Sequence, residues 1–279
     1  MLALAPRRRI GVAALALAAL VAVACAAGRP AGSSARVTVF AAASLADAFR
    51  QLAAAFTHAH PGTTVSFNFA GSQQLAGQLT QAAPADVFAS ADQRYMQQVA
   101  EAGLVAGRPR PFADNRLVIA VEPGNPLGIR GLADLADPQV TVVLAAEEVP
   151  AGAYARQALA AAGVRATPSS LETDVRAVLG RVALGEADAG IVYVSDVVAA
   201  RGRVEAVAIP PEHNVVVSYP IAVLAPAPNP DGARAFVDFV LSPAGQAVLA
   251  RFGFSPSLAG PAQPGLSARS TASSTDGRL

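Results

Sequence analysis

Two serines lie where a strand-like run passes into a helix. Ser44 follows the β-branched and aromatic run 37–40 and three alanines, and Ser72 follows the alternating run 64–69. We expect Ser44 to be a helix N-cap, with Asp47 three residues later completing a partial capping box. The first N–H groups of a helix have no intrahelical partner, and the helix dipole favours negative charge there. The two openings therefore predict an anion-binding site.

Two further helix openings offer backbone donors without a hydroxyl. Pro150 suits the first turn of a helix and leaves the N–H of Ala151 able to face a ligand. Thr173 is the expected N-cap of the next helix, which makes the N–H of Val175 available. Tyr193 ends a buried apolar strand and adds a phenol hydroxyl. All of these groups are neutral hydrogen-bond donors.

A pocket of neutral donors suits one class of anion. Sulfate, molybdate and tungstate carry no proton near neutral pH and need only donors, whereas phosphate carries a proton and needs an acceptor. Arg176 follows Val175 but projects about 100° away around the helix. We expect Asp174 to act on its helix N-terminus instead of facing the cleft. Size would separate molybdate from sulfate, and the sequence does not measure a cavity.

A serine hydrolase is the alternative chemistry. Ser44 or Ser72 would need His58, His60 or His213 as a base. The chain has no nucleophile elbow of the form Gly-x-Ser-x-Gly, and the first two histidines lie roughly 20 Å along the helix from Ser44 at about 1.5 Å per residue. No His, Cys or carboxylate cluster has the spacing of metal ligands. The residues therefore predict a binding protein without catalytic residues, cation site or cofactor.

The elements that must position these donors alternate in type. Strands and helices alternate through 36–115, which predicts a parallel sheet covered by helices in a first lobe. The strands Arg116–Val121 and Ser218–Leu224 are long enough to cross between two lobes. A second lobe, with these hinge strands, would span 116–224, and 225–257 would return to the first lobe. The predicted fold is thus α/β and two-lobed, with a hinge and a ligand cleft between the lobes.

The two ends of the chain lie outside this fold. Residues 1–25 have three arginines and then an apolar run, the layout of an export signal peptide. Cys25, the only cysteine, follows small residues and is a predicted lipid attachment point rather than a reactive thiol. Residues 26–35 are a predicted flexible tether, and 258–279 are a predicted disordered tail.

Composition narrows the class of protein further. The formal net charge is +1, and every basic residue other than histidine is an arginine. A nearly neutral chain carries no nucleic-acid footprint. We therefore expect an exported monomer in the periplasm or at the outer face of the cytoplasmic membrane, held to a membrane only through a lipid anchor.

Several short motifs, taken in order, resemble one family. They are Val39–Leu45, Pro84–Asp92, Val149–Gly152 with Tyr154-Ala155, Asp174–Arg176, Gly190–Tyr193, Tyr219-Pro220 and Arg251–Phe254. Together they resemble the periplasmic molybdate-binding proteins of ABC transporters over about residues 36–256. The resemblance implies a two-lobed fold with an oxyanion buried between the lobes and an ABC permease as partner.

The same resemblance implies a ligand set. Carried over by position, the groups that bind molybdate fall on Ser44, Ser72, Ala151, Val175 and Tyr193. Tungstate is expected to bind too, because its size and charge nearly equal those of molybdate, and sulfate in the same fold is the alternative. The sequence departs from the family at Ala70–Gln73, where a run of serines is frequent and only the hydroxyl of Ser72 remains.

Overall fold

The computed structural model describes residues 35–257, which belong to one compact unit. Strands and helices alternate through its first part, as the apolar spacings predicted. The elements there are β1 (Ala35–Ala42), a 3₁₀ turn η1 (Ala43–Leu45), α2 (Ala46–Ala59), β2 (Thr63–Ala70), α3 (Ser72–Thr80), β3 (Val87–Ala89) and α4 (Gln93–Glu101).

The middle part runs between two long strands, and two helices follow it. Its elements are β4 (Arg110–Val121), η2 (Leu132–Ala136), β5 (Val142–Ala145), α5 (Pro150–Ala161), β6 (Ser170–Glu172), α6 (Val175–Ala183), β7 (Ala189–Tyr193), α7 (Val194–Ala200), β8 (Glu205–Ala208) and β9 (Val216–Val223), followed by α8 (Pro230–Leu241) and α9 (Pro243–Arg251). The sequence did not predict β6 or α7, which are both short.

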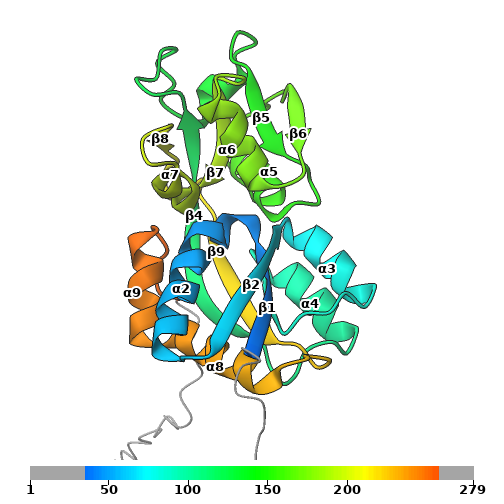
Figure 1. The fold of residues 1–279 in the computed structure, drawn as a ribbon. Helices are drawn as coiled ribbons and strands as arrows, with labels where there is room; N and C mark the ends of the chain where they lie inside the picture. Colours follow the sequence, from blue (N-terminus) through cyan, green and yellow to red (C-terminus); the bar gives the residue numbers. More distant parts are fainter. Residues whose placement is uncertain (1–34, 258–279) are drawn as a thin grey trace, which may run out of the picture. The chain divides into compact units, whose positions relative to one another are not determined.

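The described strands form one mixed sheet in the order β2-β1-β3-β9-β4-β7-β5-β6, with β8 paired to β4. Two parallel groups, β2-β1-β3 and β7-β5-β6, lie at its ends. The antiparallel pair β9-β4 joins them: the first part of β4 pairs with β9, and Leu117–Val121 pairs with β7 (Figure 1). These are the two strands that the sequence predicted as crossings.

The crossing strands continue through two prolines. β4 begins at Arg110 rather than Arg116, and Pro111 lies opposite Pro220 of β9. Proline has no N–H to donate and is disfavoured inside a sheet. The register shifts between Pro111 and Ala113, so the two residues without an N–H face each other at an irregularity and both strands continue.

Helices cover both ends of the sheet with apolar faces. The buried face of α2 carries Phe49, Leu52 and Phe56, and the Phe56 ring centroid lies 5.3 Å from that of Phe236 in α8. Helix α8 contacts β1, and α9 contacts α2. We call β1–β3 with α2–α4, α8 and α9 the β1 half, and β5–β8 with α5–α7 the β5 half. The chain thus returns to the β1 half after β9, while the residue boundaries of two lobes stay a prediction.

The predicted signal peptide with Cys25, and the predicted tail, lie outside the described residues. Within 35–257, no helix is both long enough and apolar enough to cross a bilayer.

Candidate functional site

All five residues predicted to bind the anion line one small cavity. They are Ser44, Ser72, Ala151, Val175 and Tyr193. The other lining residues are small or apolar apart from one carboxylate: Ala42, Ala43, Gly71, Ala91, Val149, Pro150 and Asp174. The centre of a water molecule could occupy about 10 Å³ of this cavity, which is close to the space that one water needs. The cavity in this structure is therefore small.

The cavity lies where the two halves meet. The β1 half contributes the end of β1 with η1 and the start of α3, and the β5 half contributes the starts of α5 and α6 and the end of β7 (Figure 1). Polar contacts join the halves beside it. Gln73 Nε2 donates to the Thr173 carbonyl at 2.9 Å, and Arg94 Nη2 and the Tyr95 hydroxyl both donate to the Glu148 carbonyl.

Ser44 does not cap a helix, contrary to the sequence-based expectation. The chain first makes the turn η1, so that Leu45 is the N-cap of α2 and no side chain caps it. The Asp47 carboxylate forms an ion pair instead of a capping box. Ser44 is buried, and its Oγ lies 3.0 Å from the Tyr219 hydroxyl. The extra turn places this hydroxyl in the cavity rather than on the α2 N-terminus.

Ser72 is the first residue of α3, and Gly71 is the N-cap. The backbone N–H of Ala91 donates to Ser72 Oγ at 3.0 Å. A hydroxyl has one hydrogen and two lone pairs. Because Ala91 occupies a lone pair, the hydrogen of Ser72 remains for another acceptor.

Helices α5 and α6 present backbone N–H groups. Ala151 is in the first turn of α5, where N–H groups have no intrahelical partner. At α6 the N-cap is Asp174, not Thr173 as expected, because the carboxylate reaches the helix directly. Its Oδ1 accepts from the N–H groups of Arg176 at 2.8 Å and Ala177 at 3.0 Å. This capping leaves the N–H of Val175, and it confirms that Asp174 acts on its own helix. Asp174 also lines the cavity, so the expectation that it would stay out of the cleft was wrong.

A glycine lets α5 approach the end of β5. A Cβ at Gly152 would overlap the backbone carbonyl oxygens of Ala145 and Ala146. Backbone atoms cannot rotate away as a side chain can, so only glycine permits this approach. The position of the Ala151 N–H therefore depends on Gly152.

Tyr193 has the most unusual polar atom of the cavity. The residue is 1% exposed, and among the described residues its hydroxyl has no hydrogen-bond partner. Burial raises the pKa of Tyr193 well above its usual value, so the phenol stays neutral and able to donate. Asp196 Oδ2 accepts the backbone N–H of Tyr193 at 3.1 Å and holds the start of α7 in place.

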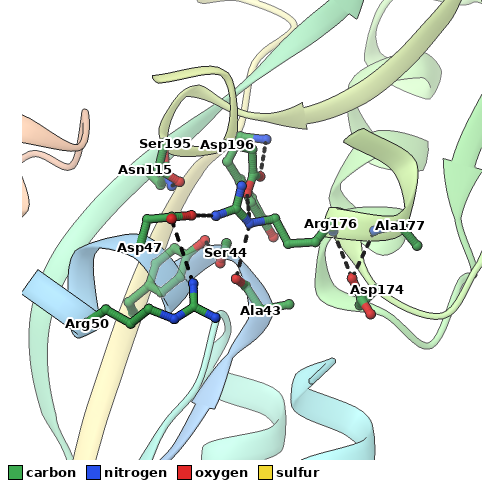
Figure 2. Close-up of polar contacts among 12 residues, drawn as sticks. Ala43, Ser44, Asp47, Arg50, Asn115, Asp174, Arg176, Ala177, Ser195 and Asp196 are labelled. Carbon is green, nitrogen blue, oxygen red and sulfur yellow. Dashed lines mark hydrogen bonds and ion pairs between the residues drawn. The ribbon is translucent and has the colours of Figure 1, made fainter. Parts of the chain in front are cut away.

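A charged crevice of about 440 Å³ adjoins the cavity and shares Ala43 and Asp174 with it. Arg176 of α6 forms an ion pair with Asp47 of α2, and its Nε lies 3.4 Å from the Ala43 carbonyl oxygen and 3.5 Å from Asp196 Oδ1 (Figure 2). Burial raises the pKa of Asp196 to about 6, and Arg176 opposes this rise. Arg176 thus links the two halves from outside the cavity.

Sequence reasoning missed Asp196 and the role of Asp47, and it named Tyr219 only within a family motif. The spacing of Asp196 three residues after Tyr193 is a capping signal, and it could have revealed both α7 and this carboxylate. No local signal points to the contact of Tyr219 with Ser44, because the two residues are 175 positions apart.

The histidines form no pair with these serines. The His60 ring stacks on Phe56 with centroids 4.2 Å apart, and its Nδ1 lies 3.1 Å from the Phe56 carbonyl oxygen. None of the three histidines lines the cavity. The residues that the structure describes contain no cluster of His, Cys, Asp and Glu that could hold a metal ion.

Known proteins resemble this chain in sequence and in fold. The profile of the family described as "Bacterial extracellular solute-binding protein" matches residues 37–255. The molybdate-binding protein ModA of Mycobacterium tuberculosis is 46% identical over 239 residues, which are 83% of this chain and 92% of that protein.

Two solved structures show the fold. The periplasmic molybdate-binding protein of Azotobacter vinelandii has a TM-score of 0.69 at 20% identity, and the match covers 79% of this chain and 99% of that chain. The sulfate-binding protein SubI of Mycobacterium tuberculosis has a TM-score of 0.72 at 20% identity and covers 80% and 87%. At this identity the likeness concerns the fold alone, and it confirms the predicted periplasmic binding protein fold.

Proposed function

We propose a function from one premise, which is that the chain belongs to the family of bacterial extracellular solute-binding proteins. The protein captures molybdate outside the cytoplasm and delivers it to the permease of an ABC transporter. The observation that carries this proposal is the buried Tyr193 hydroxyl, which has no partner among the described residues and belongs to a cavity that no basic side chain lines.

The donors of this cavity suit a fully deprotonated dianion. Ser44 and Ser72 offer hydroxyls, Ala151 and Val175 offer N–H groups, and Tyr193 offers its phenol. Dipoles of this kind replace the hydration shell of an anion without a countercharge. A protonated oxyanion such as phosphate would bring its own donor against them, and two donors facing each other in a buried site are unfavourable.

The alternatives concern the ligand more than the site. Tungstate binds in the same way as molybdate, since the two differ little in size and charge. Sulfate is the second candidate, because the fold is shared with a sulfate-binding protein. The relative with 46% identity over most of the chain is named for molybdate, which favours that ligand.

The protein is a carrier rather than an enzyme in this proposal. Molybdenum enters only as the oxyanion cargo, with no cofactor and no catalytic residue. The relatives are solute-binding proteins, which supports this view. The protein acts as a monomer in the periplasm or at the outer face of the cytoplasmic membrane, where a lipid on Cys25 would tether it.

Thermal unfolding with four oxyanions tests the proposal. The purified protein is heated alone and with molybdate, tungstate, sulfate or phosphate. A ligand at 100 times its Kd adds about 2.7 kcal/mol to the free energy of unfolding, which raises the Tm by roughly 5–10 °C for a protein of this size. We expect this rise with molybdate and tungstate. An equal rise with sulfate would make the protein a general oxyanion carrier, and no rise with any of the four would refute the anion site.

A further inference from the structure

The hydroxyl of Ser44 belongs to a buried hydrogen-bond chain that continues away from the cavity. Its Oγ lies 3.0 Å from the Tyr219 hydroxyl, and neither residue is more than 4% exposed. Either hydroxyl could donate in this pair. If Tyr219 donates, the hydrogen of Ser44 is left for a ligand. If Ser44 donates, the cavity meets a lone pair that repels an anion. The direction of this one bond therefore decides what Ser44 offers.

The needs of the buried phenol set that direction. Ser44 Oγ is the hydrogen-bond partner of the Tyr219 hydroxyl among the described residues. A phenol that accepted from Ser44 would leave its own hydrogen buried and unpaired, which is unfavourable.

The Tyr219 hydroxyl is therefore the donor of this pair, and Ser44 Oγ is the acceptor. The phenol hydrogen points to Ser44 Oγ, and the Ser44 hydrogen is left for the cavity. Burial raises the pKa of Tyr219, so the phenol keeps the hydrogen that it must donate. Ser72 is arranged by the same logic, because the Ala91 N–H fills one of its lone pairs.

We propose that Tyr219 is a positioning residue that fixes Ser44 as a donor and thereby makes the site reject protonated oxyanions. It lies on β9, one of the two strands that cross between the halves. This inference rests on the proposed function, because it assumes that the cavity holds an oxyanion. It adds that selectivity comes partly from a side chain that touches no ligand.

A double-mutant cycle on molybdate affinity tests the chain. The variants are Tyr219→Phe, Ser44→Ala and the double variant, and calorimetry measures each Kd. A hydrogen bond to a charged group corresponds to about 10- to 100-fold in affinity, so we expect each single variant to bind more weakly by that order. Because Tyr219 acts through Ser44, the double variant should match Ser44→Ala within about twofold. Losses that multiply would overturn the inference.

Phosphate gives the second readout, which a merely structural role would not change. In Tyr219→Phe the Ser44 hydroxyl can turn and accept, so the ratio of molybdate to phosphate affinity should fall at least about tenfold. Tyr154→Phe is the matched control. It also removes a tyrosine hydroxyl, but from a residue of α5 that does not line the cavity, so the ratio of molybdate to phosphate affinity should stay at the wild-type value. An unchanged ratio in Tyr219→Phe would contradict the proposal.

Two checks separate the possible failures. If the wild type binds none of the four oxyanions, the proposed function fails, whereas binding with multiplying losses removes only this inference. Unfolding without ligand shows whether Tyr219→Phe folds, and Ser44→Ala, which keeps the phenol, provides the second test. It removes the hydroxyl that the phenol orients, so molybdate affinity should fall by about the same factor as in Tyr219→Phe. Unchanged molybdate affinity in Ser44→Ala would contradict the proposal.

Discussion

The small cavity and the charged crevice beside it are neighbours with opposite chemistry. Hydroxyls and backbone N–H groups line the cavity, and among its described lining residues only Asp174 is charged, and it is already engaged with its own helix. The crevice contains Asp47, Arg50 and Arg176. The first two residues of α6 are divided between the cavity and the crevice. Val175 faces the cavity, while Arg176, about 100° further around the helix, reaches across to Asp47 of the β1 half (Figure 2).

This difference teaches where charge is useful in such a protein. An arginine in the cavity would attract every anion of suitable size, whatever its protonation. Neutral donors attract an anion more weakly. They distinguish a fully deprotonated oxyanion, whose oxygens can all accept hydrogen bonds, from a protonated one, which must also donate. In the crevice no selectivity is needed, and the ion pair of Arg176 with Asp47 holds the two halves together. The ligand therefore meets dipoles, and the halves meet through charge.

The largest expected effect on molybdate binding comes from moving a helix opening out of the cavity. Gly152→Ala places a Cβ against the carbonyl oxygens of Ala145 and Ala146, and overpacking of this kind costs about 3 kcal/mol. We expect molybdate binding to fall more than about 100-fold, because the α5 opening shifts. Calorimetry and denaturant unfolding measure the two effects.

The matched control is Gly180→Ala in α6, where a new Cβ meets nothing within 4 Å. Alanine is the better helix former, so this variant should gain about 0.5–1 kcal/mol of stability with unchanged affinity. Equal behaviour of the two alanine variants would show that the approach of α5 does not matter.

Removal of one cavity donor gives the next largest effect. Tyr193→Phe should weaken molybdate binding by about 2 kcal/mol, since a bond to a charged ligand is lost. The unliganded protein should be as stable as the wild type or more so, because the removed hydroxyl has no partner among the described residues. Calorimetry and unliganded denaturation decide the matter together. A variant with both lower affinity and a lower unliganded stability would mean that the hydroxyl supports the fold.

The buried carboxylate of Asp196, beside Arg176, predicts a pH effect on stability. Burial raises the pKa of Asp196 from 3.8 to about 6, so the folded protein holds this proton more tightly than the unfolded chain does. The resulting stability is complete below about pH 4 and is lost as the pH rises through about 6. Between pH 4 and 7 the wild type should lose about 2–3 kcal/mol more than Asp196→Asn, at about 1.4 kcal/mol for each tenfold change in proton affinity.

Urea denaturation across this pH range checks the prediction. Asparagine keeps an oxygen that can accept the Tyr193 N–H, so the α7 opening is preserved and only the titration is removed. Parallel curves for wild type and Asp196→Asn would show that Asp196 stays ionised throughout, held by Arg176.

Local chemistry predicted most of the cavity and little of its surroundings. Proline at a helix start and a tyrosine at a strand end are signals within a few residues of Ala151 and Tyr193, and both reach the cavity. The bond between Ser44 and Tyr219 joins the turn η1 to strand β9, far apart in the chain, which no local pattern encodes. Helix α7 was missed because its valines continue the apolar run of β7. The 3₁₀ turn at Ser44 was interpreted as the start of α2, because Leu45 and the alanines are compatible with a 3₁₀ turn and with an α-helix.

The smallest expected effect on stability concerns Arg50 in the crevice. Arg50 also contacts Asp47, at 3.7 Å, but its side chain is 63% exposed against 22% for Arg176. Exposed pairs of this kind, and a cation over a ring such as Phe69, contribute about 0.5 kcal/mol in water. Arg50→Ala should therefore change the free energy of unfolding by about that much and leave molybdate affinity unaltered, by denaturation and calorimetry.

Arg176→Ala is the comparison for that small effect. It removes a link between the two halves and leaves the carboxylate of Asp196 buried with no cation beside it, which should cost several times more than Arg50→Ala. Equal losses would mean that Asp47 holds both arginines in one network and that the halves are not joined through Arg176 in particular. The distinction matters for transport, because a link across the halves resists their opening when the anion must leave. A loss confined to Arg176→Ala would place that resistance at one side chain, one residue from the N–H that faces the cavity.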